Sequence, residues 1–267
     1  MVSFVATPIG NLKDISLRAL EALRSADVIF CEDTRHSLKL LNAYEIKKPL
    51  CACHKFNERE ASEKIISAVG EGKEVAVISD AGMPVISDPG NTVAKALKQA
   101  GIQYTVIPGA NAFLSALVLS ALPSDRFAFI GFLPDKAGER KKLLERYKNL
   151  DMTMCFHTAP QDVDRDISSM YGVFGDRKAC AVREITKIHE QSVPFTLAEG
   201  LAGEKRGEYV LIVEGAEKPV NELNSLTERE HILRYMQGGM DKKEAVKQTA
   251  RDRGVPKSEL YKFSIDL

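Results

Sequence analysis

The predicted fold rests first on one stretch in the first half of the chain: Val75-Ala-Val-Ile-Ser-Asp-Ala-Gly-Met-Pro-Val-Ile-Ser-Asp-Pro-Gly90. It opens with an apolar run, Val75–Ser79, which has the length and composition of a buried strand. A loop rich in Asp, Gly and Pro follows. A helical pattern over Thr92–Ala100 comes next, with Gly101 where a helix is expected to stop. A strand, a loop and a helix in this order form the repeating unit of a parallel sheet.

The same alternation continues on both sides of this stretch. Further strands are expected at Val2–Ala6, Val28–Cys31, Tyr104–Ile107 and Phe127–Phe132. Further helices are expected after Ser16, after Asn57 and over Asn111–Leu122, and Asn57 with Glu60 fits a capping box. We therefore predict an α/β fold whose mostly parallel sheet is covered by helices on both faces.

Three parts are expected along the chain. The alternation breaks at Pro134, so residues 1–134 are predicted to form the first, parallel α/β domain. Strands dominate residues 135–220, which predicts a second α/β domain with a smaller mixed sheet. Residues 221–267 carry short helical patterns and predict a small helical C-terminal segment.

Composition excludes several classes of protein. The 267 residues hold 37 Lys and Arg against 37 Asp and Glu, so general polyanion binding is not expected, although local basic patches are possible. Five Cys with no secretory leader indicate reduced thiols in a cytoplasmic protein. Cys51-Ala-Cys53 has no second ligand pair at zinc spacing, so no metal site is expected. The longest apolar stretch, Ala110–Leu122, is too short to span a membrane.

The loops that follow the strands carry the candidate chemistry, because parallel α/β sheets bind ligands beyond the carboxyl ends of their strands. The loop Ala6–Asp14 lacks both a dinucleotide fingerprint and a P-loop lysine, but Gly10 lets the backbone approach a ligand. Cys31-Glu-Asp-Thr-Arg35 is either an Asp–Arg pair with a helix cap or a rim that faces substrate. Ser79–Gly90 favours a site, and the small residues of Val106–Ala112 suit a flat ring or a ribose.

These loops together resemble the tetrapyrrole-methylase superfamily, and within it the bacterial small-subunit ribosomal RNA 2′-O-methyltransferase I family. The resemblance rests on long matches over nearly the whole chain. Four further motifs support it: His54-Lys-Phe-Asn57, Gly131-Phe-Leu-Pro134, Arg183-Glu-Ile-Thr-Lys187 and Gly207-Glu-Tyr-Val-Leu-Ile-Val-Glu-Gly215.

The resemblance implies two α/β domains with S-adenosylmethionine bound in the cleft between them. It also implies a homodimer whose acceptor is a cytidine ribose hydroxyl in the decoding region of 16S rRNA, free or in the small ribosomal subunit. The expected donor contacts, with Gly10 added from its loop, are Ile9, Gly10, Ala81, Gly82, Met83, Ile86, Asn111, Ala112, Thr158 and Ile185. The sequence departs from the family pattern at two places, and the first of them leaves open the second-domain contacts and the activity. His157-Thr-Ala-Pro-Gln-Asp162 replaces Tyr-Glu-Ser-Pro-His-Arg, and Met83 replaces a common Thr.

Methyl transfer to a hydroxyl needs an in-line approach and an acceptor for the hydroxyl proton. Asp88 is the first candidate for this base and Asp80 the second; the alternative role of Asp88 is to cap the helix that begins near Asn91. His54 is a third candidate, although a lone His is more often structural.

Contacts to RNA are expected from basic side chains near the site. Arg35, Lys136, Arg140 and Lys141 are the candidates, with the basic tail from Met240 onward. The alternative is that these charges only solvate helix faces.

Rival functions remain open on the sequence alone. One keeps the fold and changes the acceptor to a tetrapyrrole or a protein residue, and another is a non-catalytic RNA- or ribosome-binding relative. An NAD-dependent oxidoreductase is disfavoured, because no glycine-rich fingerprint follows a strand.

Overall fold

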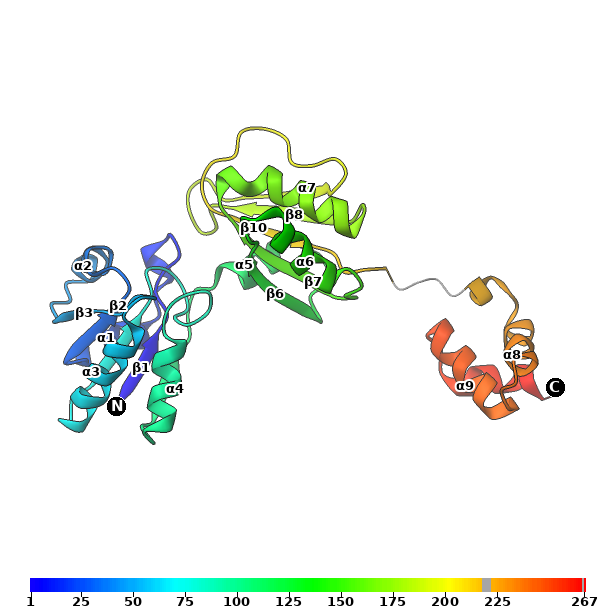
Figure 1. Ribbon diagram of the computed structural model, residues 1–267, viewed down its shortest axis with the longest axis horizontal. Coiled ribbons are helices and arrows are strands. Elements are labelled where there is room, and N and C mark those ends of the chain that lie inside the picture. The colour runs from blue at the N-terminus through cyan, green and yellow to red at the C-terminus, as the bar shows by residue number, and fades with distance from the viewer. Residues whose placement is uncertain (218–221, 266) are drawn as a thin grey trace. The chain divides into compact units, whose positions relative to one another are not determined.

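The computed structural model describes residues 1–217, 222–265 and 267 (Figure 1). The chain divides into two compact units, Met1–Ala216 and Glu217–Leu267. The first unit holds two five-stranded sheets. We call the first sheet with helices α1 to α4 the first lobe, and the second sheet with helices α5 to α7 the second lobe.

The first sheet is parallel throughout, as the sequence predicted, in the order β3-β2-β4-β1-β5. Its strands are β1 (Val2–Val5), β2 (Val28–Cys31), β3 (Leu50–Ala52), β4 (Val75–Ile78) and β5 (Tyr104–Ile107). Between them lie η1 (Leu12–Asp14), α1 (Leu17–Ser25), α2 (Thr34–Ala43), α3 (Glu58–Gly70) and α4 (Asn91–Gln99).

Side chains that alternate along these strands build two cores, one on each face of the sheet. Phe4 and Val77 pack with Ile65 of α3 and Leu97 of α4. On the other face, residues of α1 and α2 pack against the sheet, and the buried members of that cluster are Val5, Ala19, Leu23, Ala26, Ile29, Cys31, Leu41, Ile46, Ala76, Ile78 and Ile107. Both faces are thus covered, which explains why the strands read as continuous apolar runs.

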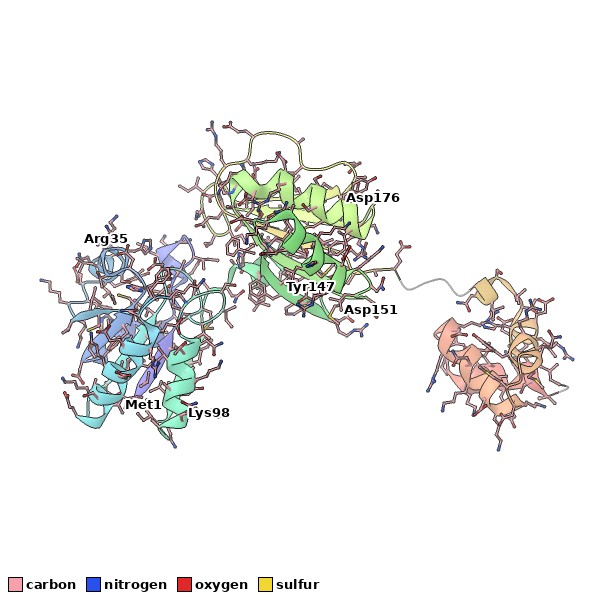
Figure 2. The ribbon with its side chains drawn as sticks, viewed as in Figure 1. Met1, Arg35, Lys98, Tyr147, Asp151 and Asp176 are labelled. Carbon is pink, nitrogen blue, oxygen red and sulfur yellow. The ribbon has the colours of Figure 1, made fainter. Side chains whose placement is uncertain are left out.

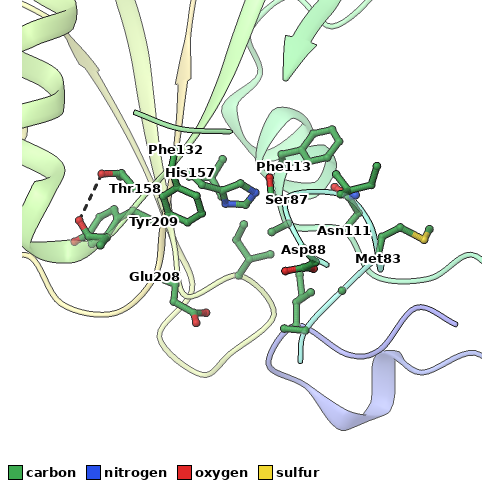
Figure 3. Close-up of a pocket in the computed structure, with 18 of the residues that line it drawn as sticks. Met83, Ser87, Asp88, Asn111, Phe113, Phe132, His157, Thr158, Glu208 and Tyr209 are labelled. Carbon is green, nitrogen blue, oxygen red and sulfur yellow. Dashed lines mark hydrogen bonds between the residues drawn. The ribbon is translucent and has the colours of Figure 1, made fainter. Parts of the chain in front are cut away.

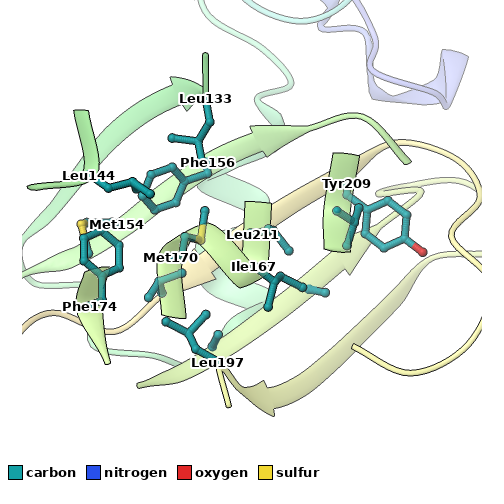
Figure 4. Packing of buried hydrophobic residues seen from close by; sticks show 14 residues of the cluster. Leu133, Leu144, Met154, Phe156, Ile167, Met170, Phe174, Leu197, Tyr209 and Leu211 are labelled. Carbon is teal, nitrogen blue, oxygen red and sulfur yellow. The ribbon is translucent and has the colours of Figure 1, made fainter. Parts of the chain in front are cut away.

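The second sheet is mixed, also as predicted, in the order β6-β7-β10-β8-β9. Its strands are β6 (Phe127–Phe132), β7 (Thr153–Thr158), β8 (Lys178–Arg183), β9 (Gln191–Thr196) and β10 (Tyr209–Val213). Only β6 and β7 run parallel to each other. The helices α6 (Ala137–Tyr147) and α7 (Val163–Phe174) cover one face, where Leu144, Phe156 and Met170 are fully buried (Figure 4). The helix α5 (Ala112–Ser120) covers the other face.

The expected domain boundary at residue 134 is wrong. Strand β6 pairs with β7 in the second sheet, and Leu117 of α5 packs against that same sheet. The change of sheet therefore falls after β5, in the connection that precedes α5. An apolar strand such as Phe127–Phe132 has the same pattern whichever sheet it joins, so local sequence could not assign it.

The starts of four helices test further predictions. Ser16 caps α1, and Asp33 caps α2 while its carboxylate pairs with Arg35, which confirms the Asp–Arg interpretation of that loop. Asn57 stands at the N-cap position of α3 but forms no capping box, because its side chain instead accepts from the His54 N–H and donates to the Ala52 carbonyl. Asp88 does not cap α4, whose N-cap is Gly90.

The second unit is helical, as expected. It contains η3 (Glu222–Ser225), α8 (Glu228–Gln237), α9 (Lys242–Arg253), α10 (Lys257–Tyr261) and η4 (Lys262–Ser264). Its small core is built from Ile232, Ala245, Val246, Ala250 and Leu260. The expected boundary between residues 220 and 221 lies outside the described residues.

Candidate active site

A pocket of about 390 Å³ lies where loops of the first lobe meet strand ends of the second. We call it the interlobe pocket. Figure 3 shows Met83, Asn111 and Asp88 on one side of it and Thr158 and Tyr209 on the other. Its lining is Ile9, Ala81, Gly82, Met83, Ile86, Ser87, Asp88, Asn111, Ala112, Phe113, Phe132, His157, Thr158, Ala159, Pro160, Ile185, Glu208, Tyr209 and Val210.

The structure gathers nearly all of the expected donor contacts in this pocket. Ile9, Ala81, Gly82, Met83, Ile86, Asn111, Ala112, Thr158 and Ile185 line it, and so does Asp88. Gly10 and Asp80 do not; they line an adjacent hollow. The loops that follow β1, β4 and β5 therefore converge as the parallel fold requires.

Two of these loops are tied together by backbone hydrogen bonds. The N–H of Thr7 donates to the Gly82 carbonyl at 2.9 Å, and the N–H of Gly82 donates back to the Thr7 carbonyl at 3.1 Å. A Cβ at Gly82 would lie 3.2 Å from Cγ2 of Ile9, so glycine permits this close approach. The bridge fixes Ile9, Ala81 and Gly82 as one wall of the pocket.

The loop after β4 holds an unfavourable backbone conformation. Val85 and Ser87 have φ of 78° and 65°, a region that L-residues with side chains rarely occupy. Strain of about 1–3 kcal/mol at such a residue persists only where the surroundings impose it, and it concentrates at functional sites. This loop presents Asp88 to the pocket.

Asp88 sits half-buried among other carboxylates. Burial, followed by the negative charge of Glu32, raises the pKa of Asp88 to about 6. Burial and the charge of Asp80 likewise raise the pKa of Glu32. A carboxylate with a pKa near neutrality is a better proton acceptor than an ordinary aspartate and is still mostly ionised at pH 7.

The second lobe contributes Thr158, which belongs to a hydrogen-bonded group. The Thr158 hydroxyl donates to the buried carboxylate of Asp166 at 2.7 Å. Arg165 donates to the other oxygen of Asp166 and also pairs with Asp135 and Asp162. Because the single hydroxyl proton of Thr158 is committed to Asp166, its oxygen can still accept a hydrogen bond from a ligand in the pocket.

Aromatic rings close another part of the pocket. His157 stacks on Phe132 with ring centroids 5.4 Å apart and meets Phe129 edge-on at 5.2 Å. Burial lowers the pKa of His157, so this ring is neutral at pH 7 and acts as an aromatic surface. Sequence reasoning missed Phe132, His157, Glu208 and Tyr209 as lining residues. Local signals were present: His157 begins the segment that departs from the family pattern, and the other three lie in the motifs Gly131–Pro134 and Gly207–Gly215.

A loop of the second lobe also contacts the β1 loop directly. The Lys187 ammonium bonds Glu184 at 3.0 Å and Glu208 at 2.9 Å. Its aliphatic stem passes so close to Gly10 that a Cβ there would lie 2.7 Å from Cγ and Cε of Lys187. The Thr186 hydroxyl donates to the Asp14 carboxylate. A side chain at position 10 would therefore displace Lys187.

Comparisons with known proteins bear on this arrangement. The model of the tetrapyrrole (corrin/porphyrin) methylases matches residues 1–200. The chain is 42% identical over 266 residues to the ribosomal RNA small subunit methyltransferase I of Bacillus subtilis, covering 96% of this chain and 91% of that protein. It is 40% identical to the Pseudomonas aeruginosa protein of the same name, covering 98% and 95%. The chain belongs to the tetrapyrrole methylase family.

Solved structures agree on the fold of this methylase. The methyltransferase CobJ matches with a TM-score of 0.61 at 17% identity, covering 80% of this chain and 94% of that one. A Thermus thermophilus uroporphyrin-III C-methyltransferase complexed with S-adenosylhomocysteine matches at 0.55 and 19% identity, covering 79% and 96%. The family is one of S-adenosylmethionine-dependent methyltransferases, so the chain is an enzyme of that class.

The residues of the interlobe pocket fit this donor. The volume lies in the range of about 300–1,000 Å³ that small-molecule sites occupy. Small side chains at Ala81 and Ala112 and the absence of one at Gly82 allow a flat ring to approach the backbone. The carboxylate of Asp88 complements the positive charge of a sulfonium or an ammonium group.

The candidate RNA contacts of the methylase differ in their availability. Arg35 extends into solvent (Figure 2), although Asp33 holds its guanidinium at two points. Lys136 and Lys141 are exposed, and among the described residues they pair only with neighbouring glutamates on α6.

The prediction that Arg140 contacts RNA is wrong. Arg140 is 7% exposed, and its guanidinium donates to Ser169 and to the carbonyls of Pro134 and Asp135. Four residues before the buried Leu144, it lies on the face of α6 that packs on the lobe, so it cannot reach a phosphate.

Other sites find no support in the described part of the methylase. No group of three or more His, Cys, Asp or Glu residues there could hold a metal ion, and the five cysteines are free thiols. Among the helices described, none has the length and apolar character needed to cross a membrane.

Proposed function

We propose that this methylase transfers a methyl group from S-adenosylmethionine to the ribose 2′-hydroxyl of a cytidine in the decoding region of 16S rRNA. Relatives named for small-subunit rRNA align with nearly the whole chain, and this similarity supports the choice of acceptor. The observation that carries the chemistry is the half-buried Asp88, with a pKa of about 6, in the wall of the interlobe pocket.

The donor supplies an activated methyl group, and the chain supplies position and a proton acceptor. Ile9, Gly82 and Ala112 form the surface against which the donor lies. Thr158 accepts one hydrogen bond from the donor, because Asp166 has fixed the direction of its own proton. Asp88 takes the proton from the ribose hydroxyl, which is a poor nucleophile until that proton leaves. Met83 and Ile86 keep water away from the reacting atoms.

RNA binding in this proposal uses exposed basic side chains of both units. Arg35, Lys136 and Lys141 serve in the first unit. In the second, Lys243, Lys247 and Arg251 are exposed and four residues apart, so they form one stripe along α9. A stripe of this kind suits contacts to successive phosphates.

Assembly and location complete the proposal. The chain forms a homodimer, and exposed apolar side chains support this: Val118 and Leu114 of α5 are 78% and 43% exposed, and Val106 and Tyr104 of the edge strand β5 are 47% and 39% exposed. The enzyme works in the cytoplasm on the small ribosomal subunit.

The test uses small subunits purified from cells that lack the gene. Incubation with the enzyme and methyl-labelled S-adenosylmethionine should place label in one 16S rRNA oligonucleotide as 2′-O-methylcytidine, read by nucleoside mass spectrometry. The Asp88→Asn variant is the control and should leave the RNA unlabelled. Label on a base, no label on the small subunits with wild-type enzyme, or label only on porphyrin precursors offered in a parallel incubation would contradict the proposal.

A further inference from the structure

A second hollow, of about 270 Å³, lies beside the interlobe pocket. We call it the α2 hollow. It is lined by residues of the β1 loop, of helix α2 and of the β4 loop: Pro8, Gly10, Leu12, His36, Lys39, Leu40, Ala43 and Asp80. The function proposed above assigns it no role.

The two cavities share the loops that the Thr7–Gly82 bridge joins. Ile9 and Ala81 line the interlobe pocket, whereas the neighbouring Gly10 and Asp80 line the α2 hollow. Adjacent Cα atoms lie about 3.8 Å apart. The two cavities are therefore close enough for one extended ligand to occupy both.

The charges in the α2 hollow are mixed. His36 and Lys39 are exposed, lie three residues apart on α2, and make no ion pair that the described residues show. Asp80 accepts one hydrogen bond, from the Asp33 N–H at 3.2 Å, and its carboxylate can accept more. Arg35 is held by Asp33 and stands apart from the lining.

A cation and a carboxylate in one hollow do not suit a bare anion, because the carboxylate repels it. They suit a nucleotide unit, which carries an anionic phosphate together with hydroxyl or amino donors.

We infer that the α2 hollow binds the nucleotide next to the methylated one. Lys39 and His36 contact its phosphate, and Asp80 accepts a hydrogen bond from its sugar or base. The inference rests on the proposed function and deepens it. It also separates the two candidate carboxylates: Asp88 faces the donor and the reacting hydroxyl, while Asp80 positions the RNA.

The experiment compares Lys39→Met with Lys98→Met. Lys98 is an exposed lysine near the end of α4 (Figure 2) and is the matched control. Binding of small subunits is measured at several KCl concentrations, and binding of S-adenosylhomocysteine at one. Lys39→Met should weaken RNA binding about 3- to 10-fold and reduce the salt slope by about 1. Lys98→Met should change neither, and both variants should bind S-adenosylhomocysteine as wild type does.

A second variant tests the role of Asp80. Asp80→Asn should raise the KM for small subunits several-fold with kcat within about 3-fold of wild type, the pattern of a lost binding contact. A 100-fold fall in kcat at unchanged KM would overturn the assignment.

The outcomes separate the two proposals. Wild-type enzyme that methylates small subunits, with Lys39→Met equal to Lys98→Met in affinity and salt slope, overturns the inference alone. Wild-type enzyme that leaves small subunits unmethylated overturns the proposed function and the inference with it.

Discussion

The two walls of the interlobe pocket are built in opposite ways. In the first lobe, the loop after β4 places Val85 and Ser87 in left-handed conformations and presents Asp88, for which the described residues show no cationic partner. In the second lobe, Thr158 and Asp166 belong to a closed network of hydrogen bonds.

This difference indicates that the two walls have different roles. A carboxylate without a cation partner, held by a strained loop, is poised to take up a proton, which is what a catalytic base must do. A satisfied buried network is rigid, which is what a positioning surface must be. Substitutions on the two walls should therefore fail in different ways.

The largest effect is expected at Asp88. Asp88→Asn should lower kcat by about 100- to 10,000-fold, the usual contribution of a positioned base. Affinity for S-adenosylhomocysteine should stay within about 3-fold of wild type. Thermal stability at pH 8 should not fall, since the substitution removes a desolvated charge whose folded-state pKa is raised. A variant with wild-type kcat would refute the role of Asp88.

The next effect is expected in the second lobe. Asp166→Ala leaves the Thr158 hydroxyl without its acceptor and Arg165 without one of its partners. Unfolding free energy should fall by about 3 kcal/mol, as when a buried ion pair loses one member. Thr158→Val is the milder companion and should weaken donor binding with kcat nearly retained. Equal losses of kcat in Thr158→Val and Asp88→Asn would contradict the proposal that the two walls have different roles.

The pH profile gives a smaller, graded effect. The proton acceptor must be ionised, so kcat should rise with pH through the Asp88 pKa of about 6 and level off above pH 7. At pH 5 it should be about a tenth of its plateau, because one pH unit below a pKa leaves about a tenth of the group ionised. The rate of the chemical step, followed in single turnovers, is the measurement. A profile flat from pH 5 to 8 would contradict this assignment.

The smallest effect is expected where the lobes touch. In Gly10→Ala the new Cβ would collide with the stem of Lys187, and Gly10 has φ of 154°. Because the flexible Lys187 side chain can move, unfolding free energy should fall by only about 1 kcal/mol. In chemical denaturation, the double variant Gly10→Ala, Lys187→Ala should lose less relative to Lys187→Ala than Gly10→Ala loses relative to wild type. The recovery should be partial, because the φ of 154° stays unfavourable for alanine when Lys187 is removed. No recovery would show that the contact with Lys187 does not explain the glycine.

The sequence predicted the first wall better than the second, for a physical reason. Loops such as Ser79–Gly90 carry their own signal, because polar and glycine residues follow an apolar strand directly. Phe132, His157 and Tyr209 reach the pocket only because β6, β7 and β10 become neighbours in the second sheet. That order depends on tertiary packing, which a local pattern does not contain.

The prediction for Arg140 failed for a different reason. The segment Asp135–Asn149 is rich in basic residues, but composition does not say which side of the helix each residue occupies. The helical period relates Arg140 to Leu144, and Leu144 is fully buried. The periodicity therefore held a signal that would have excluded Arg140 from the RNA contacts.

The most direct test of the interlobe pocket is hydrogen–deuterium exchange of the wild-type enzyme with and without saturating S-adenosylhomocysteine. The account predicts slower exchange at residues 81–88, 111–113, 157–159 and 208–210, which bring both walls together around one ligand. Saturated enzyme that shows no protection in these four segments, or protection in only one lobe, would contradict it.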